Sequence, residues 1–125
     1  MVSANQPFLL FFLLICGHAL GDFSLQNQWV ALNKERRRGD TPEPDTVPSG
    51  AKVTIWPYLL TAHSLHHGFL VFVITQSGAL AVAETAVHWV SDFGKGEAWY
   101  GFHFDQSIHI LSKAVWAGLM FYGLI

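Results

Sequence analysis

A stretch of 23 residues, from Val53 to Thr75, contains no aspartate, glutamate, lysine or arginine. An α-helix needs about 20 predominantly apolar residues to cross the hydrocarbon core of a bilayer, so this stretch is long enough. A second apolar run begins with the sequence FLLFFLLIC at residues 8–16 and continues to about Val30. Because a segment inside a bilayer must satisfy its own backbone hydrogen bonds, both runs predict membrane-spanning helices.

Two further segments complete the predicted fold. Residues 77–90 are rich in small side chains, and residues 105–125 are polar at the start and apolar at the end. Both are marginal by hydropathy alone. We predict one all-α domain over residues 1–125, a four-helix transmembrane bundle with antiparallel neighbours. The predicted helices span about 7–33, 53–75, 77–94 and 105–125, with a long proline-rich cytoplasmic loop at 34–52.

Composition narrows the functional classes. The chain is 51% hydrophobic and 13% charged, whereas a typical soluble domain has about 25% charged residues. A net charge of −2 provides no basic field for nucleic acid, and the hydrophobic content excludes intrinsic disorder. Cys16 is the single cysteine, which excludes an intramolecular disulfide framework. Residues 1–7 carry no lysine or arginine, so we expect an uncleaved helix rather than a secretory signal peptide.

Basic residues predict the orientation of the helices. Lys34, the arginines at 36–38 and Lys52 flank the first loop, and Lys95 flanks the third. The segment before the first helix, the turn at 76–78 and the C-terminus have none. Because lysine and arginine concentrate in cytoplasmic loops, both basic loops are predicted to be cytoplasmic, with both termini on the opposite side.

Every predicted helix carries two potential metal ligands four residues apart. Residues at positions i and i+4 share one face of a helix, and zinc sites of the H-E-x-x-H type use the same spacing. The pairs are His18 and Asp22, His63 and His67, His88 and Asp92, and Asp105 and His109. In an antiparallel bundle we expect them to form two layers. The deeper layer is His18, His67, His88 and His109, and the shallower layer is Asp22, His63, Asp92 and Asp105.

Other polar residues extend these faces. Glu84 and Lys113 each lie one helical turn deeper than the layer of four imidazoles, so we predict an intramembrane ion pair between them. Gln26 continues the face of the first pair and is expected to support the ligands from outside. Lys95 is expected to neutralise a carboxylate or to contact an anionic headgroup.

A shared interior site would offset the burial of these charges. An ionisable side chain at the bilayer centre costs about 2.5–3.5 kcal/mol, whereas structural zinc contributes about 10–16 kcal/mol in zinc-finger peptides. Imidazole with carboxylate suits several divalent metals, of which zinc is our first candidate, with one or two ions. Asp22 and Asp105 are candidate general bases or orienting partners, and Lys95 is a candidate phosphate contact. The alternative is a polar network that holds the helices together without a metal.

Three short sequences carry a resemblance to a known family. They are GHALGDFSLQ at 17–26, HWVSDFGK at 88–95 and DQSIH at 105–109. They resemble a family of small bacterial and phage membrane proteins, domain-of-unknown-function family 3307, with the pattern H-x-L-x-D-F-x-x-Q, a histidine-rich helix, H-x-x-x-D-x-x-K and D-Q-x-x-H. The sequence HSLHH at 63–67 matches more loosely. The resemblance covers nearly the whole chain and implies a small integral protein of a bacterial inner membrane.

Three functions remain open at this point. A metal-dependent hydrolase acting on a lipid or a membrane-surface ester is the leading hypothesis, because the ligand set is expected near headgroup depth. A metal-ion or proton transporter would use the same pairs as an ion path. A non-catalytic phage or bacterial membrane protein would need the polar residues only to hold its core. The lipid bilayer is the expected partner, nucleic acid is not expected, and association into a homo-oligomer stays open.

Overall fold

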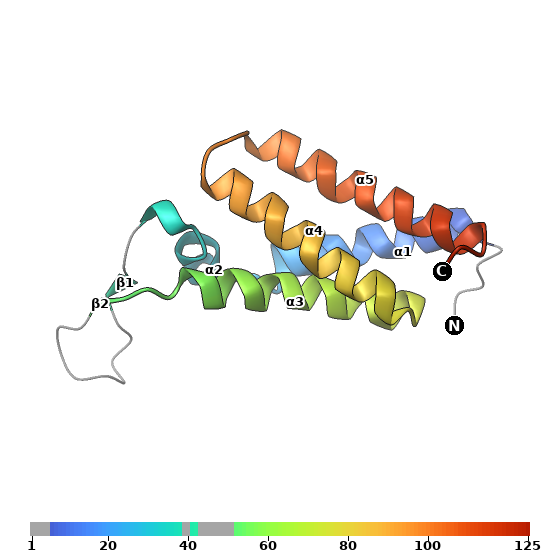
Figure 1. Ribbon diagram of the computed structural model, residues 1–125, viewed down its shortest axis with the longest axis horizontal. Coiled ribbons are helices and arrows are strands. Elements are labelled where there is room, and N and C mark those ends of the chain that lie inside the picture. Colours follow the sequence, from blue (N-terminus) through green and yellow to red (C-terminus); the bar gives the residue numbers. More distant parts are fainter. Residues whose placement is uncertain (1–5, 39–40, 43–51) are drawn as a thin grey trace.

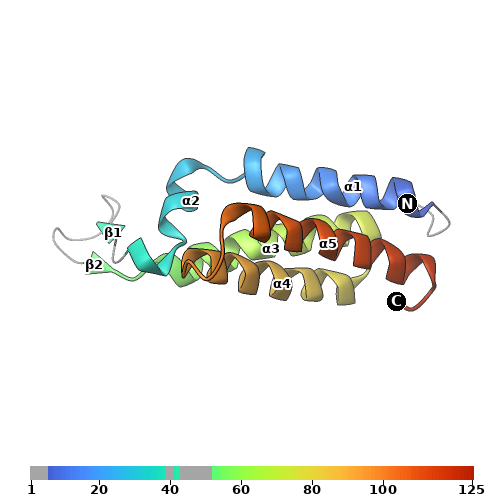
Figure 2. The same cartoon turned by 90° about the horizontal axis from the view of Figure 1, so that it is seen from above.

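The computed structural model describes residues 6–38, 41–42 and 52–125. Four helices form an elongated bundle, in which α3 lies along α4, α4 along α5, α5 along α1 and α1 along α3 (Figure 1). The start of α1 and the end of α5 lie at the same end of the bundle (Figure 2). The helices are α1 (Pro7–Ala19), α3 (Trp56–Thr75), α4 (Gly78–Gly96) and α5 (Phe102–Phe121). The all-α architecture predicted from the sequence is therefore confirmed for the main elements.

The prediction of one continuous helix over residues 7–33 is wrong. After α1 the chain forms a π-helical turn, η1 (Leu20–Ser24), and then a separate short helix, α2 (Gln28–Asn33). The break occurs because the side chain of Asn27 accepts a hydrogen bond from the backbone N–H of Val30 at 2.8 Å, which starts a new helix. Helix α2 runs across the end of the bundle instead of continuing α1 (Figure 2).

The remaining element bounds differ from the predicted ones by a few residues. Helix α3 starts at Trp56 instead of Val53, and α5 starts at Phe102 instead of Asp105. A left-handed residue, Gln76, ends α3 with φ of 59°. The Ser77 side chain then starts α4 by accepting a hydrogen bond from the backbone N–H of Leu80 at 3.2 Å. These two residues make the tight reversal that places α3 and α4 side by side.

Part of the predicted loop at 34–52 has regular structure. A 3₁₀ turn, η2 (Arg36–Arg38), follows α2, and two short strands, β1 (Thr41–Pro42) and β2 (Lys52–Val53), pair antiparallel. The rest of the predicted loop, residues 39–40 and 43–51, lies outside the described residues.

The interior of the bundle changes from aliphatic to polar along its axis. At the end that holds the start of α1 and the end of α5, five aliphatic side chains pack together. This aliphatic cluster is Leu10, Leu14, Val71, Leu80 and Ala117. Toward the other end, the buried side chains are mainly histidine, aspartate, glutamate, serine and lysine.

The outside of the bundle is apolar over all four long helices. Large exposed side chains include Phe12 on α1, Phe69 on α3, Val82 on α4 and Leu111 on α5. Two helical segments, Pro7–Ser24 and Trp56–Thr75, are long and apolar enough to cross a membrane. They coincide with the two apolar runs that the sequence indicates most strongly, whereas α4 and α5 do not pass that test.

Candidate metal centre

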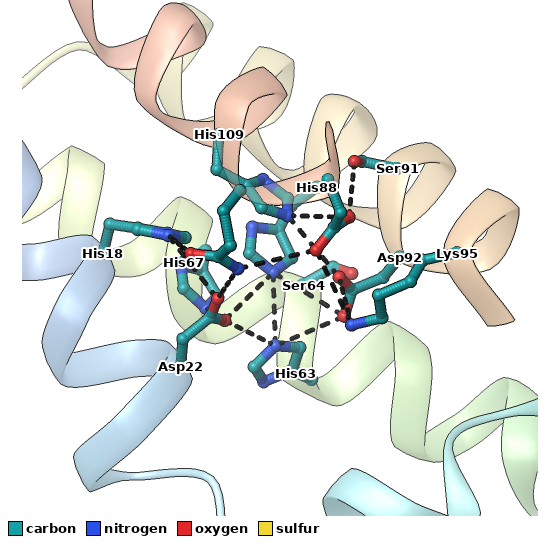
Figure 3. A network of polar contacts seen from close by, with 12 residues as sticks. His18, Asp22, His63, Ser64, His67, His88, Ser91, Asp92, Lys95 and His109 are labelled. Atoms are coloured by element: carbon teal, nitrogen blue, oxygen red, sulfur yellow. Dashed lines mark hydrogen bonds and ion pairs between the residues drawn. The ribbon is translucent and has the colours of Figure 1, made fainter. Parts of the chain in front are cut away.

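The four i, i+4 pairs meet in the interior of the bundle (Figure 3). Seven of the eight residues are buried, and Asp22 is the most exposed, with 9% of its side chain accessible. We call this set the polar cluster: His18, Asp22, His63, His67, His88, Asp92, Asp105 and His109. The antiparallel arrangement brings them together because each pair lies on the inward face of its segment of the chain.

The four imidazoles expected in one layer do lie side by side. The ring of His88 stacks on that of His67, with ring centroids 3.6 Å apart, and on that of His109 at 4.1 Å. His18 closes the group, with its ring centroid 5.0 Å from that of His109 and 5.4 Å from that of His67. Every helix of the bundle therefore supplies one ring to this layer.

Asp22 faces three imidazole nitrogens that come from two other helices. Its Oδ1 atom lies 3.2 Å from Nε2 of His63, 3.1 Å from Nε2 of His67 and 3.6 Å from Nε2 of His88. The Nε2 atoms of His63 and His88 are 3.2 Å apart. Asp22 sits on the π-helical turn η1, and single π turns inside helices are frequent at functional sites.

Several atoms of this group have no hydrogen-bond partner among the described residues. They include Oδ1 of Asp22, Nε2 of His67, and both ring nitrogens of His109. An unsatisfied buried polar atom costs about 1–3 kcal/mol, so native proteins rarely leave several together. A cation between Oδ1 of Asp22 and Nε2 of His67, which belong to one group of potential ligands, would satisfy both of these atoms.

Asp92 and Asp105 have basic partners, in contrast to Asp22. Buried Lys34 donates a close hydrogen bond to Oδ2 of Asp92. The ammonium of Lys95 lies 3.5 Å from Oδ1 of Asp92 and 3.7 Å from Oδ2 of Asp105. Of the two roles expected for Lys95, the contact with a carboxylate is present. The expectation that Lys34 belongs to a solvated loop is wrong, because its side chain is buried.

Two residues that sequence reasoning missed donate hydrogen bonds to carboxylates of the polar cluster. Ser91 donates to Oδ1 of Asp105 at 2.8 Å. The side-chain amide of Gln106 donates to Oδ2 of Asp22 at 3.0 Å, and its oxygen lies 3.2 Å from Nε2 of His18. Both residues stand inside the quoted motifs HWVSDFGK and DQSIH, which is the signal that would have pointed to them.

The expected contact between Glu84 and Lys113 is present one turn deeper. The Lys113 ammonium donates to Oε1 of Glu84 at 2.6 Å, and both side chains are fully buried. The indole N–H of Trp116, a further residue that sequence reasoning missed, donates to Oε2 of Glu84 at 2.7 Å. Oε1 of Glu84 also lies 3.6 Å from Nδ1 of His88, so this pair borders the polar cluster.

The remaining sequence candidates lie around this group. Gln26 donates from its side chain to the backbone oxygen of Asp22 at 3.2 Å and does not reach the ligand atoms of that carboxylate. His66 and His103 are exposed on the outside of the bundle.

At the α2 end, the hydrogen-bonded guanidinium of Arg36 holds the pKa of Glu97 below its usual range, and Glu97 in turn raises the pKa of Arg36.

Comparison with known proteins gives one match. A family model described as "Protein of unknown function (DUF3307)" matches residues 10–122, which is nearly the whole chain and includes all eight residues of the polar cluster. No curated protein and no solved structure matches the chain.

Proposed function

The chain belongs to the DUF3307 family, and we propose that it is a membrane protein that binds one divalent metal ion, with zinc the first candidate. The proposed ligands are Asp22, His63, His67 and His88. Imidazole nitrogens and carboxylate oxygens are both ligands that zinc takes in proteins.

The spacing of the four ligand atoms carries this proposal. In a tetrahedral zinc site with bonds of about 2.0–2.1 Å, the ligand atoms are about 3.3–3.4 Å from one another. Four of the six separations here, from Asp22 Oδ1 to the three Nε2 atoms and from His63 to His88, fall between 3.1 and 3.6 Å. All four atoms lie within 4.8 Å of one another. A purely structural network of neutral imidazoles would not require three ring nitrogens to point at the same carboxylate oxygen.

The surroundings of His88 support the same interpretation. A histidine that binds a metal through one ring nitrogen usually turns the other toward a carboxylate or a carbonyl. Nε2 of His88 faces Asp22, and Nδ1 lies 3.6 Å from Oε1 of Glu84. Glu84 would therefore orient the His88 ring, while Lys113 and Trp116 hold Glu84 in place.

A zinc count on the full chain, purified in detergent, tests the proposal. We expect one zinc ion per chain, and we expect His67→Ala to reduce the count to near zero. His66→Ala is the matched control, because His66 immediately precedes His67 in α3 and is exposed, so its removal should leave one ion bound. A wild-type protein without metal after equilibration with zinc would overturn the proposal, as would equal metal loss in the two variants.

We further propose that all four long helices span the membrane. Soluble proteins bury aliphatic side chains and expose polar ones, whereas this bundle buries ion pairs and exposes Phe69, Val82 and Leu111. Charged residues in spans are tolerated when they face the bundle interior and pair there, as Glu84 and Lys113 do. The protein should remain in the membrane fraction after a high-pH wash, and recovery in the supernatant would contradict this proposal.

The topology follows from the basic end of the bundle. We propose that the end with α2, Arg36 and Lys95 faces the cytoplasm of a bacterial inner membrane and that both termini face the other side. A C-terminal reporter that is active only outside the cytoplasm should therefore be active. Activity of a cytoplasmic reporter at the same position would reverse the orientation.

A hydrolase is the second candidate function, favoured by the depth of the site. Asp22 lies near the end of the apolar segment Pro7–Ser24, so its carboxylate is close to the level of lipid headgroups. In this function the three imidazoles would hold the zinc, and water would take the fourth position in place of Asp22, where the metal would acidify it. Asp22 and Asp105 are the carboxylates placed to accept a proton, and Lys95, with 21% of its side chain exposed, is placed to meet an anionic phosphate. A transporter is less supported, because the aliphatic cluster fills the bundle interior at the other end.

Hydrolysis is tested with phospholipid vesicles that contain the full chain. We expect release of a water-soluble or fatty-acid product that stops on chelation, returns with zinc and is absent in His88→Ala. The control is His103→Ala, which alters an exposed histidine at the start of α5. Activity that survives both chelation and His88→Ala would rule out a metal-dependent hydrolase and leave metal binding as the function.

A further inference from the structure

A second group of potential ligands lies beside the proposed zinc site. Nε2 of His109 is 3.3 Å from Oδ1 of Asp105 and 3.5 Å from Oδ1 of Asp92. Ligand atoms of these three residues lie within 4.8 Å of one another, and all three side chains are buried. None of the three belongs to the set proposed for zinc.

His109 is the member that points to a cation. Its side chain is fully buried, and neither ring nitrogen has a hydrogen-bond partner among the described residues. Nε2 is nevertheless directed at two carboxylate oxygens. A buried ring nitrogen between two buried carboxylates is placed to share a positive ion with them.

Two lysines approach the same carboxylates in different ways. Lys34 is 5% exposed and makes a close hydrogen bond to Asp92. The ammonium of Lys95 lies 3.5 and 3.7 Å from the carboxylate oxygens of Asp92 and Asp105, beyond the usual 2.7–2.9 Å of a charge-assisted hydrogen bond. It is also more accessible, with 21% of its side chain exposed. Lys34 is thus a fixed partner, whereas Lys95 is loosely held at the edge of the site.

We propose that Asp92, Asp105 and His109 form a second divalent-cation site, which the Lys95 ammonium fills and thereby keeps free of metal. Two carboxylates and two ammonium groups balance in charge, so the site is neutral while both lysines are in place. A divalent ion added beside Lys95 would face a positive charge at short range in a medium of low dielectric constant, which disfavours binding. One imidazole and two carboxylates suit zinc or manganese.

The second site bears on the proposed function because it decides whether the centre holds one ion or two. Two-metal hydrolytic sites have ions about 3.5–4 Å apart, and they clamp an anionic substrate. The single cationic side chain of Lys95 takes the place of that second ion here. The inference rests on the polar cluster but uses ligands other than those of the proposed zinc site, so the two can fail separately.

Metal counting in variants of Lys95 tests the inference. The full chain is purified in detergent, equilibrated with zinc or with manganese, and analysed for bound metal per chain. We expect one ion in the wild type, two in Lys95→Met, and one again in Lys95→Met combined with Asp105→Asn. Lys95→Arg is the matched control, because it keeps the positive charge, and it should hold one ion.

Each outcome separates the two proposals. Two ions in the wild type, or the same count in wild type and Lys95→Met, would overturn the role of Lys95 as resident cation. No ion in the wild type and one in Lys95→Met would overturn the proposed zinc site and keep the second site. If Lys95→Met loses its helical circular dichroism, the metal count of Lys95→Gln is compared with that of the wild type instead, because glutamine is uncharged and keeps a polar side chain.

Discussion

The two ends of the bundle interior are built on the same helical geometry and differ in chemistry. In α4 the residues Leu80, Glu84, His88 and Asp92 follow one another at intervals of four and are all buried. In α5 the series Asp105, His109, Lys113 and Ala117 has the same spacing in the reverse order. Each stripe is aliphatic at the end with the chain termini and polar at the other, and the Glu84–Lys113 ion pair lies at the boundary.

The comparison shows which residues fix the fold and which determine the chemistry. In the bilayer that we propose for this bundle, lipid tails are as apolar as leucine, so aliphatic packing in its interior would contribute through close contact rather than through exclusion of water. The aliphatic cluster can therefore be built from any side chains that fill the space. The polar cluster depends on residue identity, because each donor and acceptor needs a particular partner.

The largest effect on stability is expected at the boundary between the two ends. Lys113→Met leaves the Glu84 carboxylate buried with only Trp116 as a hydrogen-bond donor, and breaking a buried pair costs about 3–5 kcal/mol. Combining it with Glu84→Gln should recover most of that loss, because no charge is then left unpaired. Chemical denaturation in micelles measures both. If the losses in unfolding free energy of the two single variants simply add in the double variant, Glu84 and Lys113 do not stabilise the fold as an ion pair.

A cavity in the aliphatic end should reduce stability without affecting the metal. Leu80→Ala removes a fully buried side chain, and such truncations cost about 2–5 kcal/mol. We expect the zinc count to stay at one per chain. Val82→Ala on the same helix is the control, since Val82 is 72% exposed and its truncation should change stability little. Zinc loss in Leu80→Ala would mean that the two ends are not separable.

The sequence predicted the polar cluster because its signal is local. A pair at i and i+4 fixes the face of one helix, and four such pairs in an antiparallel bundle leave few ways to bury them except together. The contact between Glu84 and Lys113 was predictable for the same reason. Glu84 and Lys113 each lie one helical turn beyond a histidine of the polar cluster, on the same face of the helix.

The residues that the sequence did not indicate depend on contacts between distant segments. Lys34 reaches Asp92 only because the chain breaks at Asn27 and α2 turns across the end of the bundle. The break itself had a local signal, an asparagine able to cap a new helix, but the apolar run before it favoured a continuous span. Gln106 gave no periodic signal, because its role is to connect Asp22 and His18 on another helix.

Replacement of a glycine in η1 tests how tightly the polar end of the bundle is packed. A Cβ atom at Gly21 would overlap the imidazole ring of His67, including Nε2 at 2.5 Å. Gly21→Ala should therefore displace a proposed ligand and weaken zinc binding by about 10–100-fold, the range found when supporting residues of metal sites are changed. Gly118→Ala is the control at the aliphatic end, where a Cβ would meet open space. Equal zinc affinity in both variants would contradict the assignment of His67 as a ligand.

The smallest effect is expected outside the bundle interior, where Arg36 meets Glu97. Their side chains are joined by two hydrogen bonds of 2.8 and 2.5 Å, and this contact lowers the pKa of Glu97 below its ordinary value of 4.5. Because the folded-state pKa is lowered, the stabilisation is complete above pH 4.5 and is lost as the pH falls through the folded value. Both groups meet solvent, so the contribution is small.

Glu97→Gln isolates this contribution from the titration of the histidines. The difference in unfolding free energy between wild type and variant should be largest near neutral pH and should shrink below pH 4.5. The zinc count at neutral pH should be equal in the two proteins, since neither Arg36 nor Glu97 belongs to the polar cluster. A difference that is independent of pH would show that the pair acts by packing alone. Loss of zinc would show that the α2 end and the metal centre are coupled.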